Sequence, residues 1–449
     1  MNNTLLRLPE PGIYKFDISD ENQRSRLHLR VDEDLSGLLV INASKIIYLN
    51  QSALAMAYLH LNKVKKQESI EIMLDKFDVD EAALTADFDA TVAKIEALID
   101  ENNPVCPICD LGLSTNMPFS AKLSAPYRMD LAITYRCNND CAHCYNARAR
   151  NHPELSTREW KSVIDKLWDI GIPHVVFTGG EPTLREDLPE LVAYADQKGM
   201  VTGINTNGIR LADQSFLDRL VEAGLDHVQI TLESHDAKIH DQMVRRSGAW
   251  EKTIAGLRNV VKSKLYMMTN TTLLNNNAGH LRETLEFLAQ ESVPTVGLNA
   301  LIYSGKGKTV DTGLKEVELP GLLSLAIKKT NLNHQCLIWY TPTQYCHFDP
   351  LMLDLGIKGC TAAYYNMCVE PDGNVIPCQS YYQAVGNILT DDWNEIWNHP
   401  LCLSLRNRQD IPSECNYCDF LQECGGGCPL ARDQQTPEPI YRDLVISRR

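Results

Sequence analysis

The sequence lacks any run of about 18 consecutive apolar residues, so no segment is expected to span a membrane. Its beginning, MNNTLLRLPEPG, lacks the basic and apolar regions of a secretory signal. A surplus of basic charge is also missing, because the formal net charge is −15. A nucleic-acid-binding protein usually carries such a surplus or a basic stripe. These absences predict a cytoplasmic protein that binds neither a membrane nor nucleic acid.

Cysteine is absent from residues 145–335 but frequent on both sides of that stretch. Of the chain's 15 cysteines, eight lie between Cys360 and Cys428. In a chain without a secretory signal, clustered cysteines favour metal binding over disulfides. A disulfide framework does not require such a gap, whereas metal sites before and after a cysteine-free barrel would produce it. We therefore expect separate groups of metal-binding cysteines.

The patterning divides the chain into four segments and predicts the α/β class. Residues 1–104 show short strands, including a hairpin that turns near Asn42, and then three helices, which predicts a winged-helix-like α+β module. Residues 105–126 form a linker. Residues 127–334 alternate six short apolar runs with helical stretches, which predicts a partial (β/α)6 barrel of TIM type with a parallel sheet. Residues 335–449 are rich in Cys, Pro, Asp and Gly, which fits a small domain held together by metal.

A C-x3-C-x2-C loop follows directly on the first barrel strand, MDLAITY. Its cysteines are Cys137, Cys141 and Cys144. Barrels place their chemistry at the C-terminal ends of the strands, and a tight loop with these gaps can point three sulfurs at one centre. Structural zinc fits less well, since zinc sites favour paired C-x2-C units. A [4Fe–4S] cluster normally takes four thiolates, so one ligand has to come from elsewhere.

With Tyr145 after its last cysteine, this loop resembles that of the radical S-adenosylmethionine (SAM) enzymes. The resemblance implies that the three cysteines bind three irons of a [4Fe–4S] cluster and that SAM chelates the fourth iron. It also implies that an electron from the cluster cleaves SAM to a 5′-deoxyadenosyl radical, which abstracts hydrogen. The electron would come from a donor such as flavodoxin or ferredoxin.

Segments after the next strands resemble further motifs of the same family. TGGEP resembles the motif whose backbone and glutamate receive the SAM ammonium group, NTNG resembles a segment near SAM, and VQITLESHD resembles a stretch more often written Ser-Leu-Asp-Gly. Arg245 or Arg246 is a candidate partner of the SAM carboxylate, or else an ordinary arginine on a helix surface. The resemblance implies these SAM-binding residues: Tyr145, Gly179, Gly180, Glu181, Pro182, Asn205, Asn207, Thr231 and Arg246.

The C-terminal cysteines resemble the SPASM extension of radical SAM enzymes. Twelve residues separate Cys360 from Gly373, four separate Gly373 from Cys378, and CNYCDFLQECGGGC then gives C-x2-C-x5-C-x3-C. The resemblance implies one or two auxiliary iron–sulfur clusters. By that resemblance, auxiliary cluster I is bound by Cys360, Cys378 and Cys428. Auxiliary cluster II is bound by Cys415, Cys418 and Cys424.

The fourth ligands of both auxiliary clusters stay open. The family pattern has one more cysteine after a further gap, and no cysteine follows Cys428 here. Cluster II would then use an oxygen ligand such as Asp433 or Asp443, borrow another cysteine or keep an open iron. For cluster I the candidates are Cys346, Cys368 and a substrate thiolate, although Cys368 also fits an inward strand residue of the hairpin CVEPDGNVIPC.

A separate C-x2-C pair, Cys106 and Cys109, lies in the linker before the barrel. Such a pair can bind a metal or act as a redox pair. No second pair lies nearby in the sequence, so plain linker thiols are an equal interpretation.

The N-terminal module gives the clue to the substrate. LLVINASKIIYLNQSALAMAYL resembles the PqqD-like peptide-recognition modules of enzymes that modify ribosomal peptides. An exposed edge strand can bind an extended leader peptide by strand addition. Residues 1–100 carry 11 basic and 17 acidic side chains, which disfavours DNA binding and permits a leader with basic residues. The alternative is a structural cap on the barrel.

These features predict an oxidoreductase that matures a ribosomally made precursor peptide. It would bind the peptide by its leader and form a thioether or carbon–carbon crosslink, with the auxiliary clusters accepting the second electron. The alternative is a small-molecule radical SAM enzyme of haem or quinone-cofactor biosynthesis. A sulfatase maturase is disfavoured, because those enzymes carry an aspartate base where Gln379 follows Cys378 here.

Overall fold

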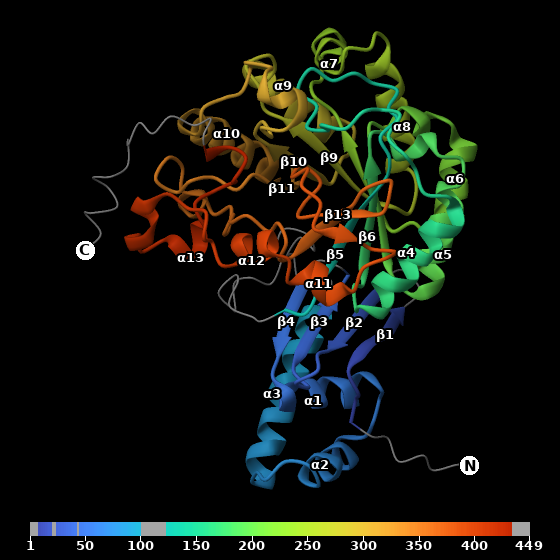
Figure 1. Ribbon diagram of the computed structural model, residues 1–449, viewed down its shortest axis with the longest axis vertical. Helices are drawn as coiled ribbons and strands as arrows, with labels where there is room; N and C mark the ends of the chain where they lie inside the picture. The colour runs from blue at the N-terminus through green and yellow to red at the C-terminus, as the bar shows by residue number, and fades with distance from the viewer. Residues whose placement is uncertain (1–7, 20–23, 43–44, 100–122, 433–449) are drawn as a thin grey trace. The chain divides into compact units, whose positions relative to one another are not determined.

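The computed structural model describes residues 8–19, 24–42, 45–99 and 123–432 (Figure 1). The chain forms two compact units: residues 1–116 with 168–173, and residues 117–167 with 174–449. In the described part of the chain, every helix is too short or too polar to cross a lipid bilayer. Four residues considered above as ligands or redox groups lie outside the described residues: Cys106, Cys109, Asp433 and Asp443.

The N-terminal unit contains an antiparallel sheet followed by helices, in the order that the sequence predicted. The strands are adjacent in the order of the chain: β1 (Gly12–Ser19), β2 (Arg24–Val31), β3 (Gly37–Ile41) and β4 (Lys45–Leu49). The helices are α1 (Gln51–Leu61), α2 (Lys66–Leu74) and α3 (Glu81–Ile99). The expected hairpin is the pair β3–β4, in which Ile41 lies opposite Lys45.

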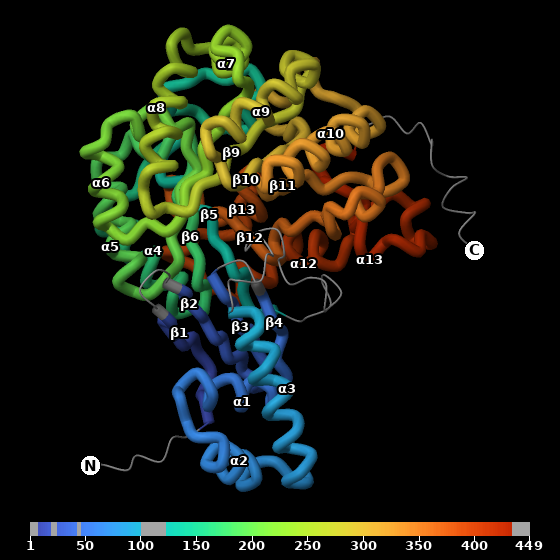
Figure 2. The backbone as a smooth tube through the Cα atoms, turned by 180° about the vertical axis from the view of Figure 1, so that it is seen from behind, coloured from blue at the N-terminus to red at the C-terminus, as the bar shows by residue number. Residues whose placement is uncertain are grey.

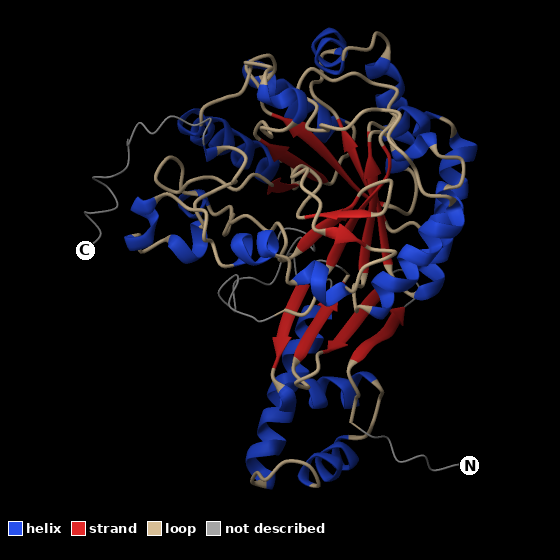
Figure 3. Ribbon diagram, viewed as in Figure 1, coloured by secondary structure: helices blue, strands red, loops and turns tan. Residues whose placement is uncertain are grey.

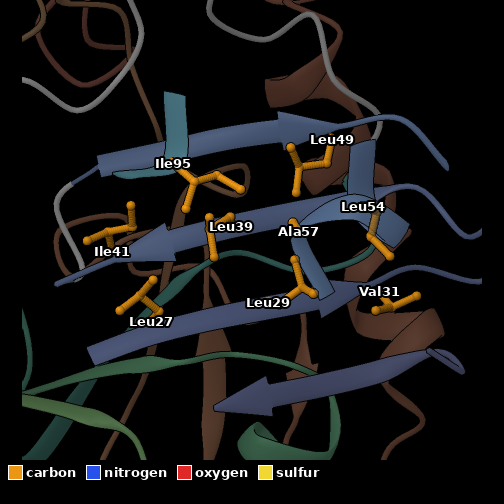
Figure 4. Close-up of a cluster of buried hydrophobic side chains, with 9 residues drawn as sticks. All are labelled: Leu27, Leu29, Val31, Leu39, Ile41, Leu49, Leu54, Ala57 and Ile95. Atoms are coloured by element: carbon orange, nitrogen blue, oxygen red, sulfur yellow. The ribbon is translucent and has the colours of Figure 1, made fainter. Parts of the chain in front are cut away.

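One hydrophobic cluster attaches the helices to this sheet (Figure 4). Alternate residues of a strand face the same side, so Leu27 and Leu29 of β2 and Leu39 of β3 point into the cluster together. Ala57 of α1 and Ile95 of α3 complete it from the helices. Burial contributes about 1.5–3 kcal/mol for each large aliphatic side chain. The described sheet therefore has one face covered by helices, and it ends at β1 and β4.

The second unit contains a ten-stranded sheet, and the six predicted barrel strands form its parallel core. Each pairs in parallel with the next along the chain: β5 (Arg128–Thr134), β6 (His174–Gly179), β7 (Val201–Thr206), β8 (His227–Thr231), β9 (Tyr266–Thr272) and β10 (Thr295–Asn299). A further parallel strand, β11 (Cys336–Trp339), pairs with β10. Beyond β5 the sheet continues with three short strands: β12 (Asn366–Val369), β13 (Asn374–Ile376) and β14 (Gly386–Asn387).

Helices cover the outer side of the parallel strands (Figure 3). They are α4 (Thr157–Asp169), α5 (Leu188–Lys198), α6 (Gln214–Glu222), α7 (Ala237–Val244), α8 (Ala249–Val261), α9 (Leu281–Gln290) and α10 (Leu319–Leu332). In α4, Trp160, Val163 and Leu167 recur at helical spacing and are buried. Ser156 and Glu159 form the predicted capping box before α4, with hydrogen bonds of 2.8 and 3.3 Å. The partial-barrel prediction is confirmed.

The C-terminal part consists of short elements that follow β11 (Figure 2). Its helices are α11 (Trp393–Trp397), α12 (Pro400–Arg406) and α13 (Leu421–Cys424). The predicted hairpin is β12–β13, in which Cys368 lies opposite Ile376. Short 3-10 helices in this unit are Pro182–Leu184, Ile209–Ala212, Ala278–His280, Gly305–Lys308, Glu316–Glu318, Pro350–Leu353 and Ser413–Tyr417.

Candidate active site

The cysteine loop begins at the C-terminal end of β5 and is fixed by backbone hydrogen bonds. The amides of Asp140 and Ala142 donate to the last carbonyls of α7, at 3.0 and 2.9 Å. Burial raises the pKa of Cys137 to about 11 and also raises the pKa of Cys141, and repulsion from Cys144 adds to both shifts. The three thiols therefore lie within electrostatic reach of one another. Ligation requires thiolates, so binding a cluster here would release their protons.

Two glycines let the end of β6 lie directly against this loop. The Gly180 amide donates to the Thr134 carbonyl at 2.7 Å. A Cβ atom at Gly180 would lie 2.4 Å from the Arg136 carbonyl oxygen, and one at Gly179 would lie 2.0 Å from the Thr134 oxygen. Gly179 also has a φ of +131°, which side chains disfavour. Only glycine permits this approach, so the Gly-Gly pair forms a cradle that brings the backbone up to the cysteine loop.

Glu181 joins the loop after β6 to the loop after β7. Its side chain is 1% exposed. One carboxylate oxygen accepts from the hydroxyls of Thr183 and Thr206, at 2.6 and 2.7 Å, and the other accepts from the Asn207 amide at 2.8 Å. Burial raises the pKa of Glu181, and these donors oppose the rise. Pro182 follows at the start of a 3-10 helix. That the backbone and glutamate of this motif bind the SAM ammonium group remains a prediction.

Asn207 and Arg246 both hold the cysteine loop through Asn138. The side-chain amide of Asn207 donates to the Asn138 side-chain oxygen at 2.6 Å, and the Arg246 guanidinium donates to the Asn138 carbonyl. Arg245 is exposed and ends α7 with a φ of +52°. The remaining expected residues, Asn205 and Thr231, are half-buried on β7 and β8. The expected SAM-binding residues thus lie on neighbouring strand ends around one loop.

Sequence reasoning missed a second buried carboxylate that binds the cysteine loop. Glu233, at 1% exposure, accepts from the Thr272 amide at 2.9 Å and lies 2.9 Å from Nε2 of His143. Its own amide donates to Nδ1 of His240 at 3.2 Å. Glu233 occupies the place of the aspartate in the family's Ser-Leu-Asp-Gly stretch, and that substitution was the available signal. It fixes the residue immediately before Cys144.

Three side chains in and beside the cysteine loop contact the C-terminal part. The Tyr145 hydroxyl donates to the Gln379 side-chain oxygen at 3.1 Å. Arg148 donates two hydrogen bonds, of 2.6 and 2.7 Å, to the fully buried carboxylate of Glu370. The Tyr135 hydroxyl donates to the same carboxylate at 3.0 Å. The β12–β13 hairpin and the residue after Cys378 therefore lie against the loop that carries the motif cysteines.

The thiols of the three cysteines expected for auxiliary cluster I act electrostatically on one another, although these residues are far apart in sequence. Burial and then the charge of Cys360 raise the pKa of Cys428 to about 12, and the same two causes raise the pKa of Cys378. Cys368 is fully buried in a cluster with Ala132 and Ile376, so its packing resembles that of a core residue. The charge of Cys378 adds to the burial that raises the pKa of Cys368, which keeps Cys368 a candidate ligand as well.

The cysteines expected for auxiliary cluster II form a second group. Burial and then the charge of Cys418 raise the pKa of Cys415, and Cys415 contributes to the raised pKa of the buried Cys424. Cys418 is exposed. Cys346, a candidate for cluster I, lies beside this second group: the amide of its neighbour Tyr345 donates to Sγ of Cys424 at 3.4 Å.

The donor sets fit iron–sulfur clusters. Within the described ranges, no three His, Cys, Asp or Glu side chains are close enough to bind one metal ion. In a cubane cluster each thiolate binds a different iron, and cysteine thiolates are the usual ligands. The fit rests on thiols whose charges act on one another within each group and, for the motif loop, on the glycine cradle. Cys137, Cys141 and Cys144 would hold the cluster that meets SAM.

Sequence comparisons agree with these sites. A sequence model of the radical SAM superfamily matches residues 131–288, and a model of the SPASM iron–sulfur cluster-binding domain matches residues 360–419. Fe-coproporphyrin III synthase from Methanosarcina barkeri is 30% identical over 328 residues, which cover 66% of this chain and 81% of that protein. AdoMet-dependent heme synthase from the same organism is 26% identical over 323 residues, which cover 68% of this chain and 92% of that protein.

A structural comparison extends over nearly the whole chain. SuiB of Streptococcus suis, solved bound to its precursor peptide SuiA, matches with a TM-score of 0.68 at 17% identity. The match covers 96% of this chain and 99% of SuiB. At this identity the comparison shows a shared fold.

The barrel, the three-cysteine loop and the glycine cradle define an enzyme that binds a [4Fe–4S] cluster and SAM. The chain belongs to the radical SAM superfamily and carries a C-terminal SPASM domain. Its cofactors are accordingly the SAM-binding [4Fe–4S] cluster, SAM itself and auxiliary iron–sulfur clusters. The predictions of family, fold class and cofactors are confirmed.

Proposed function

We propose that this enzyme modifies a ribosomally made precursor peptide, whose leader binds to the N-terminal unit. The observation that carries the proposal is the four-stranded antiparallel sheet with three helices in residues 12–99. The fold of SuiB, which was solved with a precursor peptide, covers 96% of this chain, whereas the haem-related relatives align with about two thirds of it.

The sheet has the features that strand addition requires. β1 and β4 each pair with one neighbour in the described sheet, which makes them its edge strands. A leader in extended conformation can add to such an edge through main-chain hydrogen bonds, while side chains contact the surface beside it. On β4, Ile47 and Tyr48 are partly exposed. The acidic balance of residues 1–100 favours a leader with basic residues.

We infer that the product is a thioether or carbon–carbon crosslink. When bound, the cluster and SAM supply the abstraction of one hydrogen atom from the substrate. Closing a thioether then releases a proton from the peptide thiol and one electron, and the SPASM cysteines would hold the auxiliary clusters that accept this electron. A donor such as flavodoxin or ferredoxin would supply the electron that starts each turnover.

The test is a titration of the full-length enzyme with the peptide encoded by a short open reading frame beside its gene. Fluorescence anisotropy should show binding that survives most single side-chain changes in the leader. A proline placed inside the pairing segment should abolish binding, because proline removes a donor from the ladder. A proline placed outside that segment is the matched control.

Turnover of the same peptide is followed by mass spectrometry, and a crosslinked product lacks two hydrogens. Absence of binding at high micromolar peptide, together with an unchanged peptide mass after turnover, would contradict the proposal.

A second candidate is a tetrapyrrole enzyme, because the 30% identity to Fe-coproporphyrin III synthase is a specific observation in its favour. It predicts that iron-coproporphyrin III, the compound that this relative is named for making, binds the full-length enzyme with a shifted Soret band. The peptide and the tetrapyrrole are titrated in parallel, and the one that binds identifies the class. A sulfatase maturase stays disfavoured, because the residue after Cys378 is Gln379. Its carboxamide accepts a hydrogen bond from Tyr145 and cannot act as a base.

A further inference from the structure

Auxiliary cluster II lacks the last cysteine of the SPASM pattern, and the structure brings another segment to its cysteines. The amide of Tyr345 donates to Sγ of Cys424 at 3.4 Å, and this thiol donates to the Thr343 carbonyl at 3.7 Å. A Cβ atom at Gly427 would lie 3.1 Å from the Gln344 amide nitrogen. Residues 343–345 thus pack directly on the turn that carries Cys424.

The same segment is anchored from its other side, which fixes where Cys346 lies. Glu316 accepts a hydrogen bond from the Gln344 amide at 3.3 Å and lies 2.8 Å from Nδ1 of His347. The His347 amide donates back to the Gln344 carbonyl at 2.8 Å, which closes a turn around Cys346. Glu316 and His347 are both buried. Cys346 therefore lies in a turn between Tyr345 and His347, and both of these residues are hydrogen-bonded.

The surroundings of Cys346 are those of cluster II. Cys346 directly follows Tyr345, whose amide lies 3.4 Å from Sγ of Cys424. The cysteines expected for cluster I are a different set, Cys360, Cys378 and Cys428. Cys346 is also exposed, as is Cys418, so both thiols stand at the outer side of the group.

We propose that Cys346 is the fourth ligand of auxiliary cluster II and takes the place of the C-terminal cysteine that this chain lacks. The full ligand set is then Cys346, Cys415, Cys418 and Cys424. Each thiol releases its proton to solvent as its sulfur binds one iron, which gives a [4Fe–4S] cluster with four thiolates. Cluster I keeps three cysteines, and Cys368 or a substrate thiolate is left as its fourth ligand.

The first test uses the wild-type chain and does not depend on its substrate. The apoprotein and the anaerobically reconstituted protein are treated briefly with an alkylating reagent, and each cysteine is quantified by peptide mass spectrometry. Cys346 and Cys418 are both exposed and should react in the apoprotein. After reconstitution both should be protected at least about tenfold. If Cys418 becomes protected while Cys346 reacts as fast as before, the proposal is wrong.

The second test counts iron in variants that lack the SAM-binding cluster, so that only auxiliary clusters contribute. In this triple-alanine background, about eight irons are expected for two cubane clusters. Cys346→Ala should lower the count by one to four irons and expose Cys415 to alkylation. Cys402→Ala is the matched control, because Cys402 is a buried cysteine of α12 and should leave the count unchanged.

Cys346→Ser separates loss of a ligand from loss of folding. A serine oxygen can still bind iron, so this variant should keep more iron than Cys346→Ala and show an altered electron paramagnetic resonance spectrum. An unchanged iron count and full protection of Cys415 in Cys346→Ala would overturn the proposal and move the fourth ligand elsewhere in the chain.

Discussion

Replacing Arg148 with alanine is expected to destabilise the unit that contains both the barrel and the SPASM domain. Glu370 is fully buried, and its carboxylate accepts two hydrogen bonds from Arg148 and one from Tyr135. Arg148→Ala leaves the tyrosine hydroxyl as the remaining donor of these three. A carboxylate without its cation in such a site is costly, because burial penalises the charged form.

The size of the effect follows from burial and chain length. Breaking a buried ion pair costs about 3–5 kcal/mol, and the 31% exposure of the Arg148 side chain favours the lower value, about 3 kcal/mol. The unit contains ~330 residues. At about 2.1 cal/mol/K per residue, its entropy of unfolding is about 0.7 kcal/mol/K, so the midpoint of thermal unfolding should fall by about 4 °C.

The assay compares four proteins by circular dichroism at one pH: wild type, Arg148→Ala, Glu370→Gln and the double variant. Glutamine removes the unpaired charge, so the double variant should unfold at least about 2 °C above Arg148→Ala. Arg136→Ala is the matched control, because the Arg136 side chain is 53% exposed and its pair with Glu154 contributes about 1 kcal/mol or less. The reasoning would be refuted if Arg148→Ala unfolded at the same temperature as the wild type. It would also be refuted if the double variant unfolded at a lower temperature than Arg148→Ala.

Three further predictions concern the SAM site and the base of the barrel. Alanine in place of the three motif cysteines should abolish formation of 5′-deoxyadenosine, measured by chromatography, and persistent formation would reject the assignment. Gly180→Ala places a Cβ 2.4 Å from the Arg136 carbonyl and should weaken SAM binding at least about tenfold in equilibrium dialysis, whereas Gly279→Ala, in open space, should not. Burial lowers the pKa of His227 to about 4, below the 6.5 of the unfolded chain, so protonation favours unfolding as pH falls from 6.5 to 4. Between pH 7.5 and 5.5 this histidine should cost the wild type about 1 kcal/mol of stability, or about 1.5 °C, and His227→Gln should lose measurably less.

Local sequence was sufficient for the barrel and for the motif loop. The six strands are short apolar runs between helical patterns, and each forms at the predicted place. Ser156 and Glu159 predict the start of α4, because a capping box spans only four consecutive residues. The C-x3-C-x2-C spacing likewise places three thiols in one loop without any knowledge of distant contacts.

Contacts between distant segments could not be predicted in the same way. Nothing near Cys346 in sequence indicates that its turn packs on Cys424, and spacing alone left it a candidate for cluster I. Glu233 stands where the family stretch has an aspartate, but no neighbouring residue in the sequence indicates that the fold buries it against His143. The strands β11 and β12 have four residues each, too few to show a periodicity. Their place in the sheet follows from pairing with β10 and β5.

The contact between Tyr145 and Gln379 connects the two chemical centres most directly. Tyr145 follows Cys144, a ligand expected for the SAM-binding cluster, and Gln379 follows Cys378, a ligand expected for cluster I. One hydrogen bond of 3.1 Å therefore joins the neighbours of two ligands. The Arg148–Glu370 pair holds the same loop against the SPASM hairpin, so Arg148→Ala should loosen this contact as well as lower stability. A substrate that loses hydrogen at one centre and an electron to the other has to bind within reach of both. We therefore expect the reacting residue of the substrate to lie beside Tyr145 and Gln379.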